Sequence, residues 1–271
     1  MKVSVIQMVS VADTDKNLAH ASTLLRQAKE QGATLVILPE MFAHFGEKDA
    51  AVFARLWCYP NGPIRSWLSA ISNELDLWIV AGTIPVLDGD HQEKPTATSF
   101  LYNNEGDEFA RYDKIHLFDV DIEDQQQAYR ESNFYQAGSR SCVTETPVGS
   151  LGLSVCYDLR FPELYRNLSK RGSQIIAIPS AFTYQTGKSH WLPLLQARAI
   201  ENQCYILAAN QGGIHSDKRR TWGHSCVIDP WGKVLGLLEE GEGVISCEID
   251  LDEVSGIRKS IPCLNHRQEW L

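Results

Sequence analysis

The sequence lacks three features that would assign it to broad classes of protein. No apolar run approaches the ~20 residues that a membrane-spanning helix needs, and residues 1–8 show no charged leader followed by an apolar core, so no secretory signal is predicted. The longest run of Lys and Arg covers only residues 218–220, and the formal net charge is -9. Because nucleic-acid binding needs a basic face that neutralises phosphates, neither a nucleic-acid nor a membrane partner is predicted.

Closely spaced metal-binding or disulfide-forming residues are also missing. The chain has 7 cysteines, an odd number, with no CxxC pair, and its histidines include no H-x₃-H pair. Neither a zinc site nor a disulfide framework is therefore predicted. Reduced thiols indicate a cytoplasmic protein. The cysteines are Cys58, Cys142, Cys156, Cys204, Cys226, Cys247 and Cys263.

The composition is that of an ordinary globular chain. Hydrophobic residues make up 44% and charged residues 22% of its 271 residues, and no low-complexity segment or Pro/Gly/Ser-rich linker divides it. A chain of this length can bury roughly three quarters of its unfolded surface, so its core needs no disulfides. We therefore predict a single domain over residues 1–271.

Strand-like and helix-like segments alternate along the chain. Residues 35–38 and 77–81 are continuous apolar runs, which are typical of strands buried on both faces. Residues 18–28 have apolar side chains at helical spacing, after capping candidates at 13–15. The alternation predicts an α/β layered fold. The other expected helices are 64–75, 162–171 and 191–202, and the other expected strands are 3–8, 98–102, 108–112, 151–155, 174–178, 205–210, 225–229, 234–238 and 244–249.

One long segment between these elements has no clear pattern. Residues 118–137 are acidic and rich in Gln. A loop of this length in a compact domain is usually functional or mobile, and we expect the same here.

Cys156 ends an apolar strand and begins a strand-to-helix turn over residues 157–162. Nucleophiles often occupy such turns, because the side chain is exposed there and nearby backbone N–H groups can bind an oxyanion. The alternative is a buried cysteine that packs as a small hydrophobic residue. The local pattern by itself favours this alternative.

Glu40 and Lys114 also follow predicted strands directly. Glu40 is either a solvated loop residue or a general base directed into a cleft at the strand ends. Lys114 is either a surface lysine whose stem lies along apolar surface or a functional charge. Taken one at a time, both residues favour the plain structural interpretation.

The three residues occur together in segments that resemble the signatures of the nitrilase, or carbon–nitrogen hydrolase, superfamily. These segments are residues 38–40, 112–118 and 155–163, in the order and spacing of that family. The resemblance extends from Val3 to about Arg267, nearly the whole chain. Further similar segments are residues 198–203, 223–225 and 229–232.

The resemblance implies an α/β fold of the nitrilase type, a four-layer α-β-β-α sandwich. It also implies a Glu-Lys-Cys triad, in which Glu40 is the general base, Lys114 the stabilising charge and Cys156 the nucleophile. Such an enzyme is a thiol amidase that hydrolyses linear amides and needs no metal or organic cofactor. Its partners are a small-molecule amide substrate and a second copy of the chain, joined as a homodimer through helices such as 162–171.

Two supporting residues are implied in the same way. Glu131 resembles a second glutamate that the family often has before the cysteine strand, with the nearby Glu123 as the alternative. The backbone N–H of Tyr157 would help the lysine to hold the oxyanion.

The triad has to overcome a mismatch of pKa values. A free thiol titrates near 8.5 and a glutamate carboxyl near 4.3, and this gap of roughly 4 units corresponds to about 5–6 kcal/mol. We expect burial to raise the carboxyl pKa and the Lys114 ammonium to lower the pKa of the Cys156 thiol, so that the gap closes from both sides.

The acyl half of the substrate has two candidate binding regions. Arg160 could bind a substrate carboxylate bidentately, or it could pair internally with Asp158 or Glu163. Residues after the predicted strand 174–178 are expected in a ligand loop. They are Phe182, Thr183, Tyr184 and Thr186.

The finer resemblance concerns the substrate. Residues 181–191, 199–205 and 211–215 are most similar to the deaminated glutathione amidases, which implies hydrolysis of deaminated glutathione to α-ketoglutarate and cysteinylglycine, a metabolite-repair reaction. The alternative is an ω-amidase acting on α-ketoglutaramate. The two substrates share the acyl half, so the leaving-group side must discriminate between them, with Tyr184, Lys188 and His215 as candidates. A non-catalytic binding protein on the same fold is a third interpretation, and the intact Glu-Lys-Cys set disfavours it.

Overall fold

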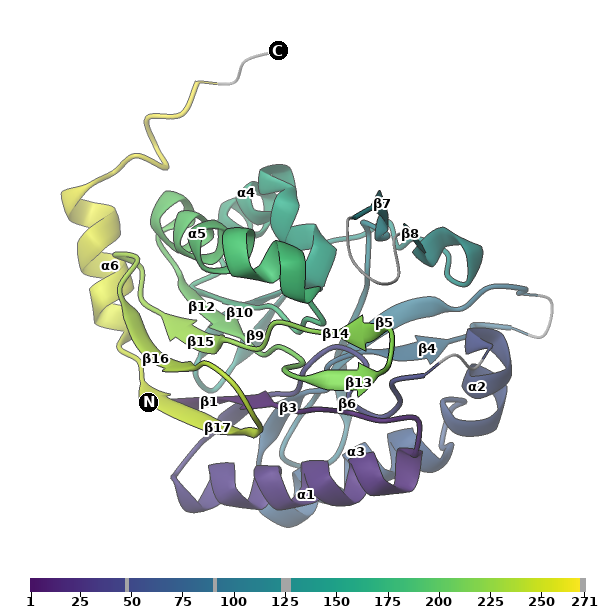
Figure 1. The fold of residues 1–271 in the computed structure, drawn as a ribbon. Coiled ribbons are helices and arrows are strands. Elements are labelled where there is room, and N and C mark those ends of the chain that lie inside the picture. The colour runs from purple at the N-terminus through teal and green to yellow at the C-terminus, as the bar shows by residue number, and fades with distance from the viewer. Residues whose placement is uncertain (47–48, 90–91, 123–127, 269–271) are drawn as a thin grey trace.

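The computed structural model of the chain describes residues 1–46, 49–89, 92–122 and 128–268. Two β-sheets pack face to face, and helices cover the outer face of each sheet (Figure 1). The first sheet has the order β17-β1-β2-β3-β5-β4, with β6 paired to β5, and the second has the order β16-β15-β12-β11-β10-β9. The bounds in the first sheet are β1 Lys2–Gln7, β2 Leu35–Ile37, β3 Trp78–Val80, β4 Ile84–Val86, β5 Thr96–Tyr102, β6 Glu108–Asp113 and β17 Gly243–Glu248. Those in the second are β9 Cys142–Thr146, β10 Gly149–Leu153, β11 Ile175–Ala177, β12 Tyr205–Ala208, β15 Ser225–Ile228 and β16 Val234–Leu238.

The layers follow from the two-residue period of the strands. Val3 and Val5 of β1 point into a core cluster shared with the second sheet, whereas Ile6 points into another cluster, against α1 and α3. On the far side, Trp191 of α5 packs in the first of these clusters, with Tyr165 of α4. The predicted four-layer α-β-β-α sandwich is therefore confirmed. The helices are α1 Thr14–Glu30, α2 Ala50–Trp57, α3 Pro63–Leu75, α4 Pro162–Lys170, α5 Tyr184–Asn202 and α6 Leu251–Ser260.

The strand directions set the position of the functional site. In the first sheet β1, β2 and β3 are parallel, and in the second β10, β11 and β12 are parallel. Parallel strands end at the same edge of their sheet, where ligands bind in open α/β folds. The residues after β2 and β10 therefore reach the same end of the sandwich.

The predicted elements are found with small shifts at their ends, and several others were not predicted, including β4 and β9. Asp13 caps α1 by accepting from the backbone N–H of Lys16. The short helices α2 and α6 and the hairpin of β13 (Ile214–Ser216) and β14 (Arg219–Arg220) are additional. Helix α5 begins at Tyr184, so Tyr184 and Thr186 lie in a helix rather than in the expected loop. The helical pattern is hidden there because Gly187 leaves room for the side chain of Trp222.

Residues 118–137, expected to form a long loop that is functional or mobile, contain short regular elements in the described part. Strands β7 (Asp119–Asp121) and β8 (Ala128–Arg130) pair antiparallel, and a 3₁₀ turn over Glu131–Asn133 follows. Glu123, the alternative to Glu131, lies outside the described residues. Within the described ranges no helix has both the length and the apolar character needed to cross a membrane.

Candidate active site

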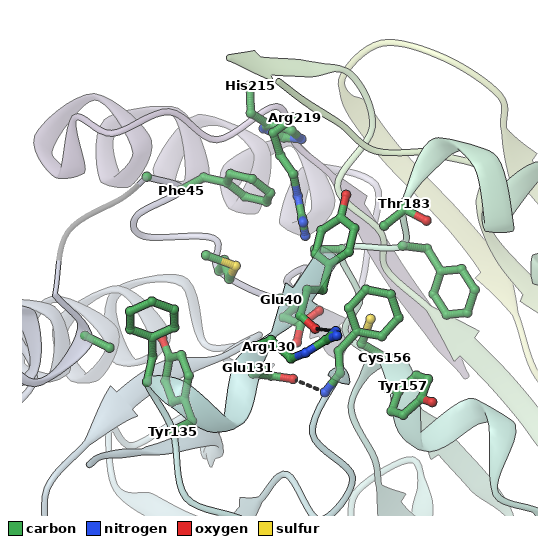
Figure 2. Close-up of a pocket in the computed structure, with 18 of the residues that line it drawn as sticks. Glu40, Phe45, Arg130, Glu131, Tyr135, Cys156, Tyr157, Thr183, His215 and Arg219 are labelled. Atoms are coloured by element: carbon green, nitrogen blue, oxygen red, sulfur yellow. Dashed lines mark hydrogen bonds between the residues drawn. The ribbon is translucent and has the colours of Figure 1, made fainter. Parts of the chain in front are cut away.

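Four predicted site residues meet at the carboxyl ends of strands from the two sheets of the sandwich and from the small sheet of β7 and β8. Glu40 follows β2, Lys114 follows β6, Cys156 follows β10, and Glu131 follows β8. Figure 2 shows Glu40, Glu131 and Cys156 directed toward the same pocket. Residues far apart in the sequence are therefore brought together by the closing of the two sheets.

Lys114 is the centre of this cluster. Its Nζ donates to Glu40 Oε1 at 2.9 Å and to the two carboxylate oxygens of Glu131 at 3.0 and 2.8 Å. Its side chain is only 2% exposed. A buried ammonium is tolerated only when it is paired, and here two carboxylates face it. Glu131 is held in turn by the backbone N–H of Phe118, which donates to its Oε2 at 2.6 Å.

The electrostatic balance keeps Lys114 charged. Burial by itself lowers the pKa of the Lys114 ammonium, but the carboxylates of Glu131 and Glu40 outweigh burial and hold this pKa well above its usual range. Burial raises the pKa of Glu131, an effect that Lys114 partly offsets and Glu40 reinforces. The two carboxylates therefore keep Lys114 in its protonated form.

Cys156 sits at a strained turn between β10 and the 3₁₀ segment Cys156–Arg160. Its φ is 48°, in the left-handed region that costs a non-glycine residue on the order of 1 kcal/mol or more. Its backbone N–H donates to the carbonyl of Pro179 at 2.9 Å, which fixes the turn against the end of β11. This is the geometry of a nucleophile held at the top of a strand.

The expected lowering of the thiol pKa is wrong in its net direction. Burial raises the pKa of the Cys156 thiol well above its usual range, and the Glu40 carboxylate adds to the rise. Lys114 does lower it, as expected, but its charge is largely neutralised by Glu40 and Glu131. Cys156 is therefore a thiol in the resting state, and an attack by its sulfur would need a base to take the proton.

The turn that carries Glu40 is fixed by residues from other strand ends. The carbonyl of Glu40 accepts from Gln211 Nε2 at 3.0 Å, and the same amide group binds the backbone N–H and the hydroxyl of Ser10. Met41 has a φ of 59°, and its N–H donates to Thr83 Oγ1 at 3.0 Å. Gly82 packs so closely that a Cβ there would lie 2.0 Å from the carbonyl oxygen of Pro39.

The cluster opens into a cavity of about 870 Å³, within the usual range for small-molecule sites. Of the predicted supporting and substrate-binding residues, those on its wall are Glu131, Tyr157, Phe182, Thr183, Thr186 and His215. Arg160 and Tyr184 are not on the wall. Arg160 Nη1 lies 3.2 Å from His190 Nδ1, and Tyr184 packs edge-on against Trp222. Their contact with substrate stays a prediction.

His215 lines the cavity in a neutral form. Its Nδ1 donates to the carbonyl of Ser10 at 2.8 Å, so its Nε2 accepts from the hydroxyl of Thr221 at 2.7 Å. Its ring stacks on Phe45, with centroids 3.8 Å apart. Burial lowers the pKa of His215 to about 4, although the hydrogen bond to Ser10 opposes this. His215 therefore offers a flat uncharged surface.

Several cavity residues were not found from the sequence. Phe45, Arg130, Tyr135, Lys218 and Arg219 all line the cavity. The basic run 218–220 is the sequence signal that could have indicated Lys218 and Arg219. Among the residues that the structure describes, no three His, Cys, Asp or Glu side chains form a set that could hold a metal ion.

Comparison with known proteins agrees with this geometry. The chain matches the carbon–nitrogen hydrolase family over residues 2–259. It is 40% identical over 273 residues to the deaminated glutathione amidase of Yersinia enterocolitica, covering 98% of this chain and 92% of that protein. It is 38% identical over 268 residues to the deaminated glutathione amidase of Homo sapiens, covering 98% of this chain and 82% of that protein.

Solved structures give the same result. The NitFhit protein of Caenorhabditis elegans has a TM-score of 0.90 and 37% identity, over 98% of this chain and 65% of that chain. An amidase from Nesterenkonia sp., whose active-site cysteine has added acrylamide, has a TM-score of 0.80 and 27% identity, over 97% of this chain and 98% of that chain. By its sequence and by its fold, this chain belongs to the carbon–nitrogen hydrolase family.

Proposed function

We propose that the chain hydrolyses the amide of deaminated glutathione to α-ketoglutarate and cysteinylglycine through an acyl-enzyme on Cys156. The observation that carries the proposal is the buried contact of Lys114 with Glu40 and Glu131 beside Cys156, at the wall of a cavity. The relatives from Yersinia enterocolitica and Homo sapiens, which are named deaminated glutathione amidases, support this substrate. The cavity of about 870 Å³ is also large enough for a tripeptide-sized amide.

In the first half of the reaction, the Cys156 sulfur attacks the amide carbon while its proton passes to Glu40. Burial raises the pKa of the thiol, so the sulfur needs Glu40 to accept its proton during the attack. The oxyanion lies near the Lys114 ammonium and the backbone N–H of Tyr157. Glu40 then gives its proton to the nitrogen as the C–N bond breaks, which leaves a thioester and a free amine.

In the second half, water replaces the amine. Glu40 accepts a proton from water as the water oxygen attacks the thioester carbon. The Lys114 ammonium and the backbone N–H of Tyr157 stabilise the second oxyanion as they did the first. The C–S bond breaks, the sulfur regains the proton, and the acid leaves. Glu131 receives two hydrogen bonds from Lys114 and fixes the position of the ammonium, so it serves as a positioning residue.

The nucleophile is tested by trapping the acyl group. Cys156→Ala should abolish turnover and leave the melting temperature close to that of the wild type, while the exposed Cys263 provides a control variant, Cys263→Ala, with normal turnover. Intact-mass and peptide-mass spectrometry of acid-quenched enzyme should find the acyl adduct on the peptide that contains Cys156. An adduct on any of the other six cysteines would contradict the assignment.

The substrate is tested by a ratio of kcat/KM values. Purified enzyme should have a higher kcat/KM for deaminated glutathione than for α-ketoglutaramate, with simple acyl amides and nitriles as controls. A ratio that favours α-ketoglutaramate would make the chain an ω-amidase, and the thiol amidase mechanism would stand. Absence of turnover with all of the amides would overturn the catalytic proposal and favour a binding function.

We further propose that the chain is a cytoplasmic homodimer. All seven cysteines are free thiols, as in a reducing compartment. Ile200 of α5 and Trp231, in the turn that packs beside it, are 53% and 63% exposed and could be covered by a second copy. Light scattering at micromolar concentration should give twice the mass of one chain, and Trp231→Glu should shift the mass toward one chain. A wild-type mass of 30.4 kDa would contradict the dimer.

A further inference from the structure

The cavity wall contains a hydroxyl group that the protein itself does not bind. Tyr135 lines the cavity, and Figure 2 shows its side chain on the side of Glu131, across the pocket from Cys156 and Tyr157. Within residues 1–46, 49–89, 92–122 and 128–268, no group forms a hydrogen bond with the Tyr135 hydroxyl. Its oxygen is not among the buried polar atoms that lack a partner in this part of the chain, so it is accessible. The hydroxyl can therefore bind a molecule in the cavity.

The backbone fixes the position of this side chain. Tyr135 follows the 3₁₀ turn that carries Glu131, and its N–H donates to the carbonyl of Glu131 at 2.9 Å. Three residues later, the N–H of Gly138 donates to the carbonyl of Lys114 at 2.8 Å. Tyr135 is thus held between the two residues whose side chains form the buried ion pair of the site.

The charges near Tyr135 decide what its hydroxyl can bind. Burial raises the pKa of Tyr135, and the carboxylates of Glu131 and Glu40 add to the rise, which Lys114 partly offsets. The hydroxyl therefore keeps its proton at neutral pH and can donate it in a hydrogen bond. Because two carboxylates face one ammonium in the cluster, negative charge is in excess there, and an anionic acceptor would be repelled. A neutral carbonyl oxygen is the acceptor that fits.

The proposed reaction places the leaving amine toward this side of the cavity. Glu40 gives its proton to the nitrogen as the C–N bond breaks, so the nitrogen must lie within hydrogen-bond reach of Glu40. The acyl half stays on the sulfur of Cys156, across the pocket from Tyr135 (Figure 2). A substituent on the nitrogen can therefore extend from Glu40 toward Tyr135.

We propose that the Tyr135 hydroxyl donates a hydrogen bond to a neutral carbonyl oxygen of the leaving amine, and so selects amides of peptide-like amines. This inference rests on the proposed amidase function and deepens it, because it names the class of leaving group. In deaminated glutathione the acceptor is the carbonyl of the cysteinyl residue. An amide whose leaving group is ammonia has no such acceptor. Tyr135 is thus a specificity-determining residue that takes no part in proton transfer.

The test crosses changes in the leaving group with a change in the enzyme. The substrates are deaminated glutathione, α-ketoglutaramate, and the amides of the same acyl group with glycinamide and with propylamine. Glycinamide keeps the carbonyl in the position that it has in cysteinylglycine, whereas propylamine has a similar length and no acceptor. The enzymes are the wild type, Tyr135→Phe and Tyr59→Phe. Tyr59 is the matched control, because it is 49% exposed and is not on the cavity wall.

Tyr135→Phe should lower kcat/KM for deaminated glutathione and for the glycinamide amide by roughly 3- to 15-fold, the effect of losing one neutral hydrogen bond. The same variant should leave kcat/KM for the propylamine amide and for α-ketoglutaramate within about twofold of the wild type. Its rate of deacylation should not change, because the amine has left by then. Tyr59→Phe should behave as the wild type with all four substrates.

Three results would overturn the inference while the amidase function stands. Equal losses with the glycinamide and propylamine amides would show that Tyr135 only supports the cavity wall. An equal loss with α-ketoglutaramate would place the hydroxyl on the acyl half, and no loss with any substrate would show that the hydroxyl does not contact the substrate. If the wild type hydrolyses α-ketoglutaramate alone, the proposed substrate and this inference fail together. If it hydrolyses none of the four amides, the amidase function itself fails.

Discussion

Asp158 binds His116 through both the backbone and the ring. Its Oδ1 accepts from the backbone N–H of His116 at 3.1 Å and lies 2.7 Å from His116 Nδ1, and its Oδ2 accepts from the Tyr112 hydroxyl at 2.7 Å and from the N–H of Val155 at 2.9 Å. The side chain of Asp158 has no solvent exposure. It therefore connects the segment that carries Lys114 to the turn that carries Cys156.

We predict that Asp158→Asn separates these two segments and lowers kcat by at least about 10-fold with a smaller change in KM. The Asn side chain keeps one acceptor oxygen, but its NH₂ group cannot accept a hydrogen bond. The buried donors that faced the second oxygen of Asp158 then have no acceptor, which costs about 1–3 kcal/mol of stability. Tyr112→Phe removes only one of the four contacts and should cost less in both properties. Steady-state kinetics and the alkylation rate of Cys156 measure the effect, and an unchanged alkylation rate would argue against a positioning role.

Lys114→Met should affect both catalysis and stability. Loss of the oxyanion charge is expected to reduce kcat on the order of 10²–10³-fold. Because Glu40 and Glu131 would face one another in a buried site, the free energy of unfolding should also fall by roughly 3–5 kcal/mol. Adding Glu131→Gln to Lys114→Met should recover part of the stability and none of the activity. Urea unfolding and kinetics of the single and double variants check this, and near-normal turnover of Lys114→Met would refute the triad.

His215 predicts an acid-dependent loss of stability. Its pKa in the folded chain is about 4, below the ordinary value of 6.5, so between these pH values the unfolded chain binds a proton that the folded chain does not. The free energy of unfolding should therefore fall as the pH falls from 6.5 to 4, by up to about 3 kcal/mol from this residue. His215→Gln should reduce the slope of stability against pH in this window. At pH 7, the difference in the free energy of unfolding between the wild type and His215→Gln reports the loss of packing alone. An unchanged slope between pH 6.5 and 4 would contradict the lowered pKa of His215.

Gly82 predicts a local effect on the position of Glu40. It has a φ of 47°, and a Cβ there would lie 2.0 Å from the carbonyl oxygen of Pro39, so Gly82→Ala must displace the turn before Glu40. We expect a loss of more than about 1 kcal/mol in stability and a fall in kcat. Gly89→Ala is the matched control, because no atom lies within 4 Å of its added Cβ. Thermal unfolding and kcat of both variants measure the difference, and equal behaviour of the two would show that the turn can relax.

Much of the fold could be predicted because its signals are local. The strand at residues 35–37 is an uninterrupted apolar run, since both of its faces are buried, and the cap of α1 at Asp13 depends on contacts within one turn. The two-residue strand β14 is too short to show an alternation. Helix α2 leaves its apolar residues Val52 and Leu56 exposed, and α6 buries only Val254, so neither helix shows a clear apolar face in the sequence. The helical start of α5 was missed because Gly187 serves a contact with Trp222, which lies 35 positions away.

The sequence by itself determined which residue types stand at the strand ends, and therefore that Glu40, Lys114 and Cys156 are candidates for one site. The tertiary structure decided how they act on one another. The pKa of the Cys156 thiol rises because burial and Glu40 outweigh a lysine whose charge is shared by two carboxylates. The tertiary structure likewise placed Arg219 on the cavity wall, because the rings of Phe45 and Tyr129 that pack against it come from segments far from it in the sequence. Burial and charge pairing depend on distances between such segments, and no local pattern records those distances.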